Sequence, residues 1–151
     1  MRRVKLVDGL AEIFMTQPKY LSGVPKGEIK ALKIVNGVTR TVIIFKKHVL
    51  KTPSIKNGWL NFIHGIESNL QERTWSGFHQ VFAKVIRSSK LGFWLIMEKA
   101  EPVPKGANWE DIKDYLSFIY HNEDIFEFIM SDCKKENWGL INGKLVKIDY
   151  A

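Results

Sequence analysis

An Asn-Gly dipeptide at positions 36 and 37 places the strongest constraint on the fold, because it lies between two runs rich in β-branched residues, Glu28–Val35 and Thr39–Phe45. Asn-Gly favours the tight turns whose twist matches an antiparallel strand pair. A third run, His48–Lys51, follows closely and ends before Pro53, which cannot donate a hydrogen bond to a sheet. The sequence therefore predicts three consecutive antiparallel strands.

The hydrophobic period changes in the next segment, from Asn57 to about Trp75. Apolar residues recur there at steps of three and four, the spacing of one helical face, at Trp59, Ile63, Ile66 and Leu70. Two further β-rich runs follow, Val81–Ile86 and Phe93–Met97, with a polar turn between them. We predict an α+β fold with an antiparallel sheet of about five strands and one helix between the third and fourth strands.

The C-terminal third predicts helices followed by a hairpin. Asn108 can cap a helix whose first turn is acidic, and a second helical segment covers Ile125–Met130. A polar loop, Ser131–Trp138, comes next. The chain then continues with two short apolar runs, of which Lys144–Asp149 is the second, and Asn142-Gly143 predicts a tight turn between them.

Length and composition exclude several classes of protein. With 151 residues, 45% of them apolar and 12% aromatic, the chain suits one domain with a hydrophobic core, which excludes long disordered, collagenous and coiled-coil structures. Its apolar runs are far shorter than the roughly 18 residues that span a bilayer, and no apolar signal segment follows Met1–Lys5. The single cysteine, Cys133, excludes an intramolecular disulfide. We expect a soluble cytoplasmic protein without membrane contacts.

The net charge of +7 is concentrated near the N-terminus. Residues 1–56 contain 12 Lys and Arg against 3 Asp and Glu, whereas residues 57–151 contain 11 against 13. This asymmetry favours a polyanionic partner, such as the phosphates of a nucleotide, a nucleic acid or an acidic protein; the alternative is a solvated basic face. Nucleic acid is the weaker choice, because the cations are scattered over strands without an aromatic stacking platform.

Three polar residues near the C-terminus have the spacing of a phosphoryl-transfer site. Asp132 is followed five positions later by Asn137, and Asp149 comes at the end of a short apolar strand. In such sites one Asp accepts the proton of a hydroxyl, while an Asn and a second Asp hold Mg²⁺, which prefers oxygen ligands. Lys134 can steady the phosphoryl group that is transferred. The alternative is a polar turn with a capping Asn and a surface Asp.

This register resembles the catalytic loop of the protein-kinase-like superfamily, in which Asp is followed by Lys two, Glu four and Asn five positions later. The four residues here are Asp132, Lys134, Glu136 and Asn137, and Asp149-Tyr150-Ala151 looks like the family's metal-binding Asp-Phe-Gly. The chain is similar to small, divergent bacterial and phage members. The resemblance implies a two-lobed fold in one domain, residues 1–151, with an N-lobe and hinge over about 1–98 and a reduced, mostly helical C-lobe over 99–151.

The resemblance also implies residues for a nucleotide site upstream. Lys51, in Val49-Leu50-Lys51, looks like the phosphate-binding lysine, and Glu72 looks like the helix glutamate that pairs with it; Glu67, on the same helix, is the less favoured alternative. The segment that contains Met97, Glu98 and Ala100 looks like the hinge that binds adenine. The implied cofactors are ATP and Mg²⁺. In this reading Asp132 and Lys134 are catalytic, and Asn137 and Asp149 hold the metal.

Departures from the family pattern leave two functions open. The turn between the first strands contains one glycine where the family has several, and only Tyr150 and Ala151 follow Asp149, so we expect neither an activation segment nor a peptide-docking platform. The first hypothesis is an ATP/Mg-dependent phosphotransferase with an unknown acceptor. The alternative is a catalytically weak or inactive pseudokinase effector of a phage. It would act in the host cytoplasm and engage a host protein or nucleic acid through the basic N-terminal third.

Overall fold

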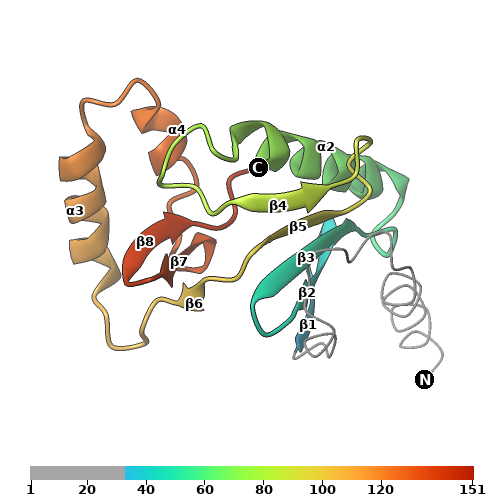
Figure 1. Ribbon diagram of the computed structural model, residues 1–151, viewed down its shortest axis with the longest axis horizontal. Helices are drawn as coiled ribbons and strands as arrows, with labels where there is room; N and C mark the ends of the chain where they lie inside the picture. Colours follow the sequence, from blue (N-terminus) through green and yellow to red (C-terminus); the bar gives the residue numbers. More distant parts are fainter. Residues whose placement is uncertain (1–32) are drawn as a thin grey trace.

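The computed structural model describes residues 33–151 (Figure 1). The start of the predicted strand Glu28–Val35, the segment Met1–Lys5 and much of the basic N-terminal third lie outside the described residues. Within the described part, a five-stranded sheet with one helix comes first, and two helices with a small three-stranded sheet follow. No helix in residues 33–151 is long and apolar enough to cross a membrane.

Every neighbouring pair in the five-stranded sheet is antiparallel, and the strand order is β1-β2-β3-β5-β4. The strands are β1 Lys33–Asn36, β2 Arg40–Ile44, β3 His48–Pro53, β4 Val85–Ser88 and β5 Leu95–Glu98. The predicted five-stranded antiparallel sheet is therefore confirmed. The first turn is longer than the tight turn expected of Asn-Gly, since pairing ends at Asn36 and Thr41, and the Gly37 N–H donates to the carbonyl oxygen of Arg40 at 2.8 Å.

The last two strands begin later than the predicted runs Val81–Ile86 and Phe93–Met97. For β4 the reason is a contact that is distant in sequence. The backbone N–H of Lys147 donates to the carbonyl oxygen of Val81 at 2.6 Å, and the N–H of Ala83 donates to the carbonyl oxygen of Lys147 at 3.0 Å. Residues 81–83 are thus drawn into the core and joined to the C-terminal hairpin instead of to β5.

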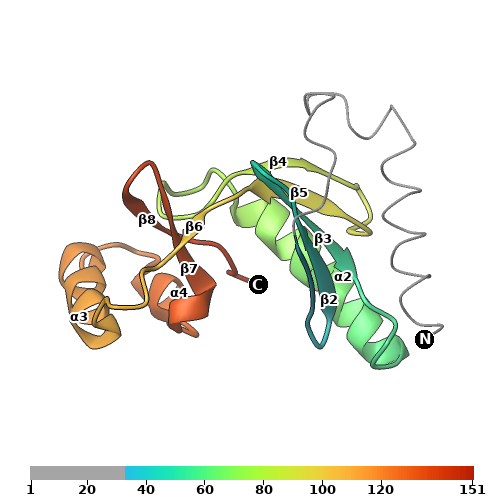
Figure 2. The same ribbon diagram turned by 90° about the horizontal axis from the view of Figure 1, so that it is seen from below.

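Helix α2, Trp59–Trp75, lies along one face of the five-stranded sheet (Figure 2). The face that is fully buried carries Gly65, Asn69 and Glu72, at helical steps of four and three. It differs from the predicted apolar stripe, in which Trp59 is 66% exposed. The predicted helix is confirmed, but the predicted buried face is wrong. The buried face carries polar residues because charged side chains of the sheet contact it, as described below.

The close approach of α2 to the sheet depends on Gly65. A Cβ at this position would overlap the carbonyl oxygen of Thr39 and would lie 3.0 Å from Cα of Pro53. We expect Gly65→Ala to lower the free energy of unfolding by about 1–3 kcal/mol, because backbone atoms must move apart. The matched control is Gly106→Ala, where a Cβ has no described atom within 4 Å. Thermal unfolding measures both, and equal melting temperatures would contradict this account of the packing.

The second part of the chain combines helices with a small antiparallel sheet, order β6-β7-β8. Its elements are β6 Glu101–Pro102, α3 Trp109–Tyr120, α4 Phe126–Met130, a 3₁₀ turn Lys135–Asn137, β7 Trp138–Ile141 and β8 Lys144–Lys147. Asn108 caps α3 through the Glu110 N–H at 3.1 Å, as expected. Asn142 and Gly143 have φ of 51° and 75°, which confirms the tight turn. The expectation of a mostly helical second part omitted β6, which pairs with β7.

One hydrophobic cluster joins the two parts. Buried side chains from β5, residues 81–83, α3, α4 and β7 meet in it, and Trp138 is its largest fully buried member. The hydroxyl of Tyr150 donates to the carbonyl oxygen of Ala83 at 2.7 Å, and its ring packs against Phe82 with centroids 4.7 Å apart. This core fixes the residues that follow β8 against the five-stranded sheet.

Candidate functional site

A cavity of about 760 Å³ opens between the five-stranded sheet and the second part of the chain. Its volume lies in the range of small-molecule and cofactor sites. The residues Lys51, Met97, Glu98, Ala100 and Asp149, all singled out from the sequence, line it. Apolar walls come from both sides, from Val35, Val42, Ile44 and Val49 of the sheet and from Val103, Trp138 and Ile148 of the second part.

A second cavity, of about 930 Å³, is lined by residues of segment 77–84, α3 and the β7–β8 hairpin. Of the candidate site residues predicted from the sequence, only Glu98 lines it. The first cavity is therefore the candidate site, because buried charged groups converge there on an apolar hollow.

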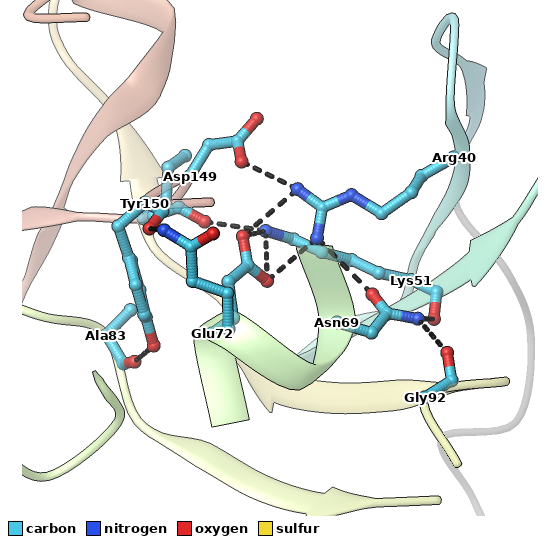
Figure 3. A network of polar contacts seen from close by, with 10 residues as sticks. Arg40, Lys51, Asn69, Glu72, Ala83, Gly92, Asp149 and Tyr150 are labelled. Atoms are coloured by element: carbon cyan, nitrogen blue, oxygen red, sulfur yellow. Dashed lines mark hydrogen bonds and ion pairs between the residues drawn. The ribbon is translucent and has the colours of Figure 1, made fainter. Parts of the chain in front are cut away.

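Lys51 and Glu72 form a buried ion pair beside this first cavity (Figure 3). Lys51 Nζ lies 2.8 Å from Oε1 and 3.0 Å from Oε2 of Glu72, and it also donates to the carbonyl oxygen of Ile148 at 2.7 Å. Lys51 is 5% exposed and Glu72 is fully buried, whereas Glu67 is exposed. Of the two helix glutamates that the sequence left open, Glu72 is the one beside Lys51.

Burial and charge act against each other in this pair. Burial alone would raise the pKa of Glu72, but the charges of Lys51 and Arg40 outweigh it and hold the pKa below its usual value. Burial lowers the pKa of Lys51, and Arg40 adds to this effect while Glu72 opposes it. The lysine is thus a desolvated cation at the wall of the cavity, where its interaction with an entering anion is strong.

Arg40 was not singled out from the sequence, although it joins this pair to Asp149 (Figure 3). One guanidinium nitrogen lies 3.0 Å from Oε2 of Glu72 and donates to Oδ1 of Asn69 at 3.3 Å. The other donates to Oε1 of Glu72 at 3.1 Å and to Oδ1 of Asp149 at 2.6 Å. Arg40 therefore connects β2, α2 and the residues that follow β8.

The strand register explains why Arg40 reaches this site. Val42 of β2 pairs with Lys51 of β3, and Arg40 lies two residues before Val42. Side chains two positions apart point to the same face of a strand. The sequence signal was the alternation of side chains between the two faces of β2. That signal places Arg40 beside Lys51 only when the exact register between β2 and β3 is known.

Asp149 lies next to Asn137 because their backbones are hydrogen-bonded. The N–H groups of Ile148 and Asp149 approach the carbonyl oxygen of Asn137 at 2.8 and 3.4 Å. Tyr150 is anchored in the core by the bond from its hydroxyl to Ala83, and it holds the preceding residue, Asp149, in place. The side chain of Asp149 is 45% exposed and lines the cavity, so its carboxylate lies where a ligand can reach it.

Asp132 lies in a polar loop with Lys134 and Asn137. The amide nitrogen of Asn137 donates to both the carbonyl oxygen and Oδ2 of Asp132 at 2.9 Å, and Lys134 Nζ lies 2.7 Å from Oδ1. Hydrogen bonds from Lys134 and Asn137 lower the pKa of Asp132, which keeps the carboxylate ionised at neutral pH. Its φ of 43° lies in the left-handed region, which the bonds from Asn137 support.

Lys147 is a second residue that was not singled out from the sequence. It is 1% exposed, and Nζ donates to the carbonyl oxygens of Phe128 at 3.1 Å, Ile129 at 2.9 Å and Ser131 at 2.5 Å. These carbonyls lie at or just beyond the C-terminal end of α4, where a cation is favoured. Burial lowers the pKa of Lys147. Lys147 therefore fixes the helix end from which Asp132 follows directly.

The residues singled out from the sequence thus fall into two groups that meet at Asn137. One group, Lys51, Glu72 and Asp149, is joined by Arg40, and the hinge residues Met97, Glu98 and Ala100 line the same cavity. The other, Asp132 and Lys134, lies in the exposed loop and does not line the cavity.

Asn137 and Asp149 have the donor chemistry of a Mg²⁺ site. The amide nitrogen of Asn137 is bonded to Asp132, which leaves its oxygen for a cation. One oxygen of Asp149 is bonded to Arg40. In residues 33–151, no group of three or more His, Cys, Asp or Glu side chains is placed to hold a metal. Two protein oxygens nevertheless fit Mg²⁺, which usually completes its shell with water and substrate phosphates.

Comparison of the sequence with models of known protein families and with curated proteins finds no match. The function of the first cavity, called the cleft below, is therefore inferred from its geometry.

Proposed function

We propose that the cleft binds ATP with Mg²⁺ and transfers the terminal phosphoryl group to a hydroxyl acceptor. The observation that carries this proposal is the buried Lys51–Glu72 pair beside Asp149, at the wall of an apolar cavity of cofactor size. A desolvated lysine held by a glutamate, next to a carboxylate that can bind a cation, is the arrangement that phosphoryl transfer uses to hold phosphates.

The proposal extends to the fold. The five-stranded sheet with α2 would be the first lobe of a protein-kinase-like fold, and residues 99–151 would be a reduced second lobe. The cavity between them supports this reading, because its apolar walls come from both parts. The base of the nucleotide would lie between Val49 and Trp138, against the segment from Met97 to Ala100.

The phosphates would extend from the apolar part of the cavity toward Lys51 and Asp149. Mg²⁺, held by Asn137 and Asp149, would neutralise phosphate charge and orient the terminal group. Lys51 would donate to the α- and β-phosphate oxygens while Glu72 keeps it in place. The positions of Lys51 and Asp149 in the lining of the cavity support these roles.

Asp132 would act as the base. The acceptor oxygen forms a bond to the γ-phosphorus, the bond from that phosphorus to the β–γ bridging oxygen breaks, and the acceptor proton passes to the Asp132 carboxylate. Lys134, 2.7 Å from Asp132, would steady the charge of the moving phosphoryl group. Because the side chain of Asp132 is 60% exposed, an acceptor can approach it from solvent.

A second candidate is a nucleotide-binding protein with little or no turnover, whose output is a contact with a host protein. The observation that favours it is that Arg40 and Lys134 neutralise the two aspartates that transfer requires. The basic segment that could serve as its docking surface lies mostly outside the described residues. Both candidates bind nucleotide, so turnover separates them.

The test of the proposal is thermal unfolding with and without ATP and Mg²⁺. At a nucleotide concentration about 100 times the dissociation constant, stabilisation of about 2.7 kcal/mol should raise the melting temperature by several degrees. Mg²⁺ alone and ATP with EDTA are run in parallel to separate the two ligands. A melting temperature that no nucleotide changes would contradict both candidates.

Asp132→Asn should leave nucleotide binding intact and reduce turnover by about 100-fold or more, because it removes the proton acceptor but retains a partner for Asn137. The comparison uses release of ADP from ATP, with the exposed Asp114→Asn on α3 as the matched control. Turnover in the parent that Asp132→Asn leaves unchanged would exclude this residue as the base. A parent protein without turnover would favour the second candidate.

A further inference from the structure

Arg40 has no role in the phosphoryl transfer proposed above, yet it joins Glu72 of the buried ion pair to Asp149 at the cavity. Its side chain is 8% exposed and bonds Glu72, Asn69 and Asp149 at once. A buried guanidinium with three partners is held in one position, since each bond depends on the same planar fork of donors. The question is which of the three partners a ligand can replace on Arg40.

The three partners differ in accessibility. Asn69 is 1% exposed and Glu72 is fully buried, and both belong to α2, whose packing fixes them. Asn69 is also bonded to the carbonyl oxygen of Gly92 at 2.8 Å, and Glu72 to Lys51. Asp149 is 45% exposed, with its carboxylate at the cavity. The bond from Arg40 to Asp149 is therefore the one that a ligand in the cavity can replace.

The charges are compatible with such an exchange. In this structure two cations, Arg40 and Lys51, are paired with two carboxylates, Glu72 and Asp149, so the formal charges of the four groups cancel. A phosphate oxygen is an acceptor of the same kind as a carboxylate oxygen and carries the same sign of charge. If it takes the place of Asp149 on Arg40, the guanidinium keeps an anionic partner and the Asp149 carboxylate is released beside the phosphate.

We propose that Arg40 is a phosphate-binding residue that exchanges partners: it holds Asp149 in this structure and, when a nucleotide binds, transfers that bond to a phosphate oxygen, which frees Asp149 to bind a cation. The inference rests on the proposed function, because it assumes that the cleft binds a nucleotide. It adds that the cation site is closed until the phosphate arrives. Cation binding and phosphate binding are then coupled, and each strengthens the other.

The first experiment measures a metal ion without nucleotide. Binding of Mn²⁺, as a spectroscopic substitute for Mg²⁺, is followed by electron paramagnetic resonance in the parent protein and in Arg40→Gln. Loss of the guanidinium should increase Mn²⁺ affinity by about 10-fold, within the usual range for coupled sites. Adding Asp149→Asn to Arg40→Gln should abolish the gain. A gain of affinity cannot result from unfolding, which would only lose the site.

The second experiment measures nucleotide without metal. ADP in the presence of EDTA is titrated by calorimetry into the parent and Arg40→Gln, and the affinity should fall by about 10-fold or more, since a charge-assisted hydrogen bond is lost. Arg73→Gln, an exposed arginine on α2, is the matched control and should bind ADP like the parent. Arg40→Lys keeps the positive charge, but lysine lacks the planar guanidinium that bonds Glu72 and Asp149 at the same time. It should show the same changes to a smaller degree.

The outcomes separate this inference from the proposed function. If ADP with Mg²⁺ binds the parent, but Arg40→Gln changes neither Mn²⁺ affinity nor ADP affinity in EDTA, the exchange is wrong while the nucleotide site stands. A loss of ADP affinity without the Mn²⁺ gain also overturns it, because Arg40 would then not be closing the cation site. If ADP binds under no condition, the proposed function fails first.

Discussion

Replacing Glu72 by glutamine is expected to lower the free energy of unfolding by about 3 kcal/mol at neutral pH, one of the two largest effects that we predict. The carboxylate is fully buried and pairs with two cations, Lys51 at 2.8 Å and Arg40 at 3.0 Å. Removing its charge leaves both cations in the interior, which costs far more than losing an exposed ion pair. Asp149 still compensates Arg40, so the loss lies at the lower end of the range for buried pairs.

The loss of unfolding free energy in Glu72→Gln should depend on pH, and the shifted pKa of Glu72 determines whether it grows or shrinks in acid. Its pKa in the folded protein is lowered by the two cations, against the opposing effect of burial. A carboxyl group with a lowered pKa contributes stability above its unfolded pKa of about 4.3, and that contribution is lost as the pH falls through the folded pKa. The difference between the parent and Glu72→Gln should therefore be full at neutral pH and should narrow in acid.

Urea unfolding at several pH values measures both the size and the direction. Glu67→Gln is the matched control, because it makes the same chemical change at an exposed position of the same helix. We expect it to change the free energy of unfolding by less than about 0.5 kcal/mol. Equal losses in the two variants, or a difference that grows as the pH falls, would contradict the buried pairing.

Replacing Lys51 by methionine should reduce the affinity for ATP with Mg²⁺ by about 10- to 100-fold, since bonds to a charged partner contribute about 1.5–3 kcal/mol. Methionine is unbranched and fills irregular space well, so the packing of β3 should survive. Glu72 keeps Arg40 as a partner, 3.0 Å away. The expected loss therefore reports on the phosphate contact and not on a collapsed fold.

The measurement is the change in melting temperature that ATP and Mg²⁺ produce at one fixed concentration. The parent should be stabilised, and Lys51→Met should lose most or all of this shift. Lys46→Met, at an exposed position between β2 and β3, serves as the control for loss of a positive charge and should keep the full shift. A parent-like shift in Lys51→Met would remove this lysine from the proposed site.

Local patterns in the sequence determined the secondary structure and the strand pairing between neighbours. β-branched runs around turns predicted β1, β2 and β3, and the apolar period predicted α2 within two residues of its observed start. Asn108 and Asn142-Gly143 predicted a cap and a turn that the structure confirms. These features depend on residues a few positions apart, whose preferences are set by local sterics and hydrogen bonding.

The candidate site was only partly accessible from the sequence. Asp149 could be singled out from motif spacing and Lys51 from the family resemblance, and the structure places both at one cavity. Glu72 could not be separated from Glu67 with certainty, because helical period alone does not show which face meets the sheet. The polar face of α2 was missed for the same reason, since Gly65 and Asn69 are buried only where the sheet approaches them.

Only the tertiary structure decided the roles of Arg40 and Lys147. Each is a cation in a strand, which the sequence alone presents as a surface residue. Arg40 is buried because partners 32 and 109 positions away supply carboxylates, and Lys147 because the end of α4 supplies carbonyl oxygens. A charge can be buried only where its partners already converge. That convergence comes from packing between distant segments, whereas the sequence determined the segments themselves.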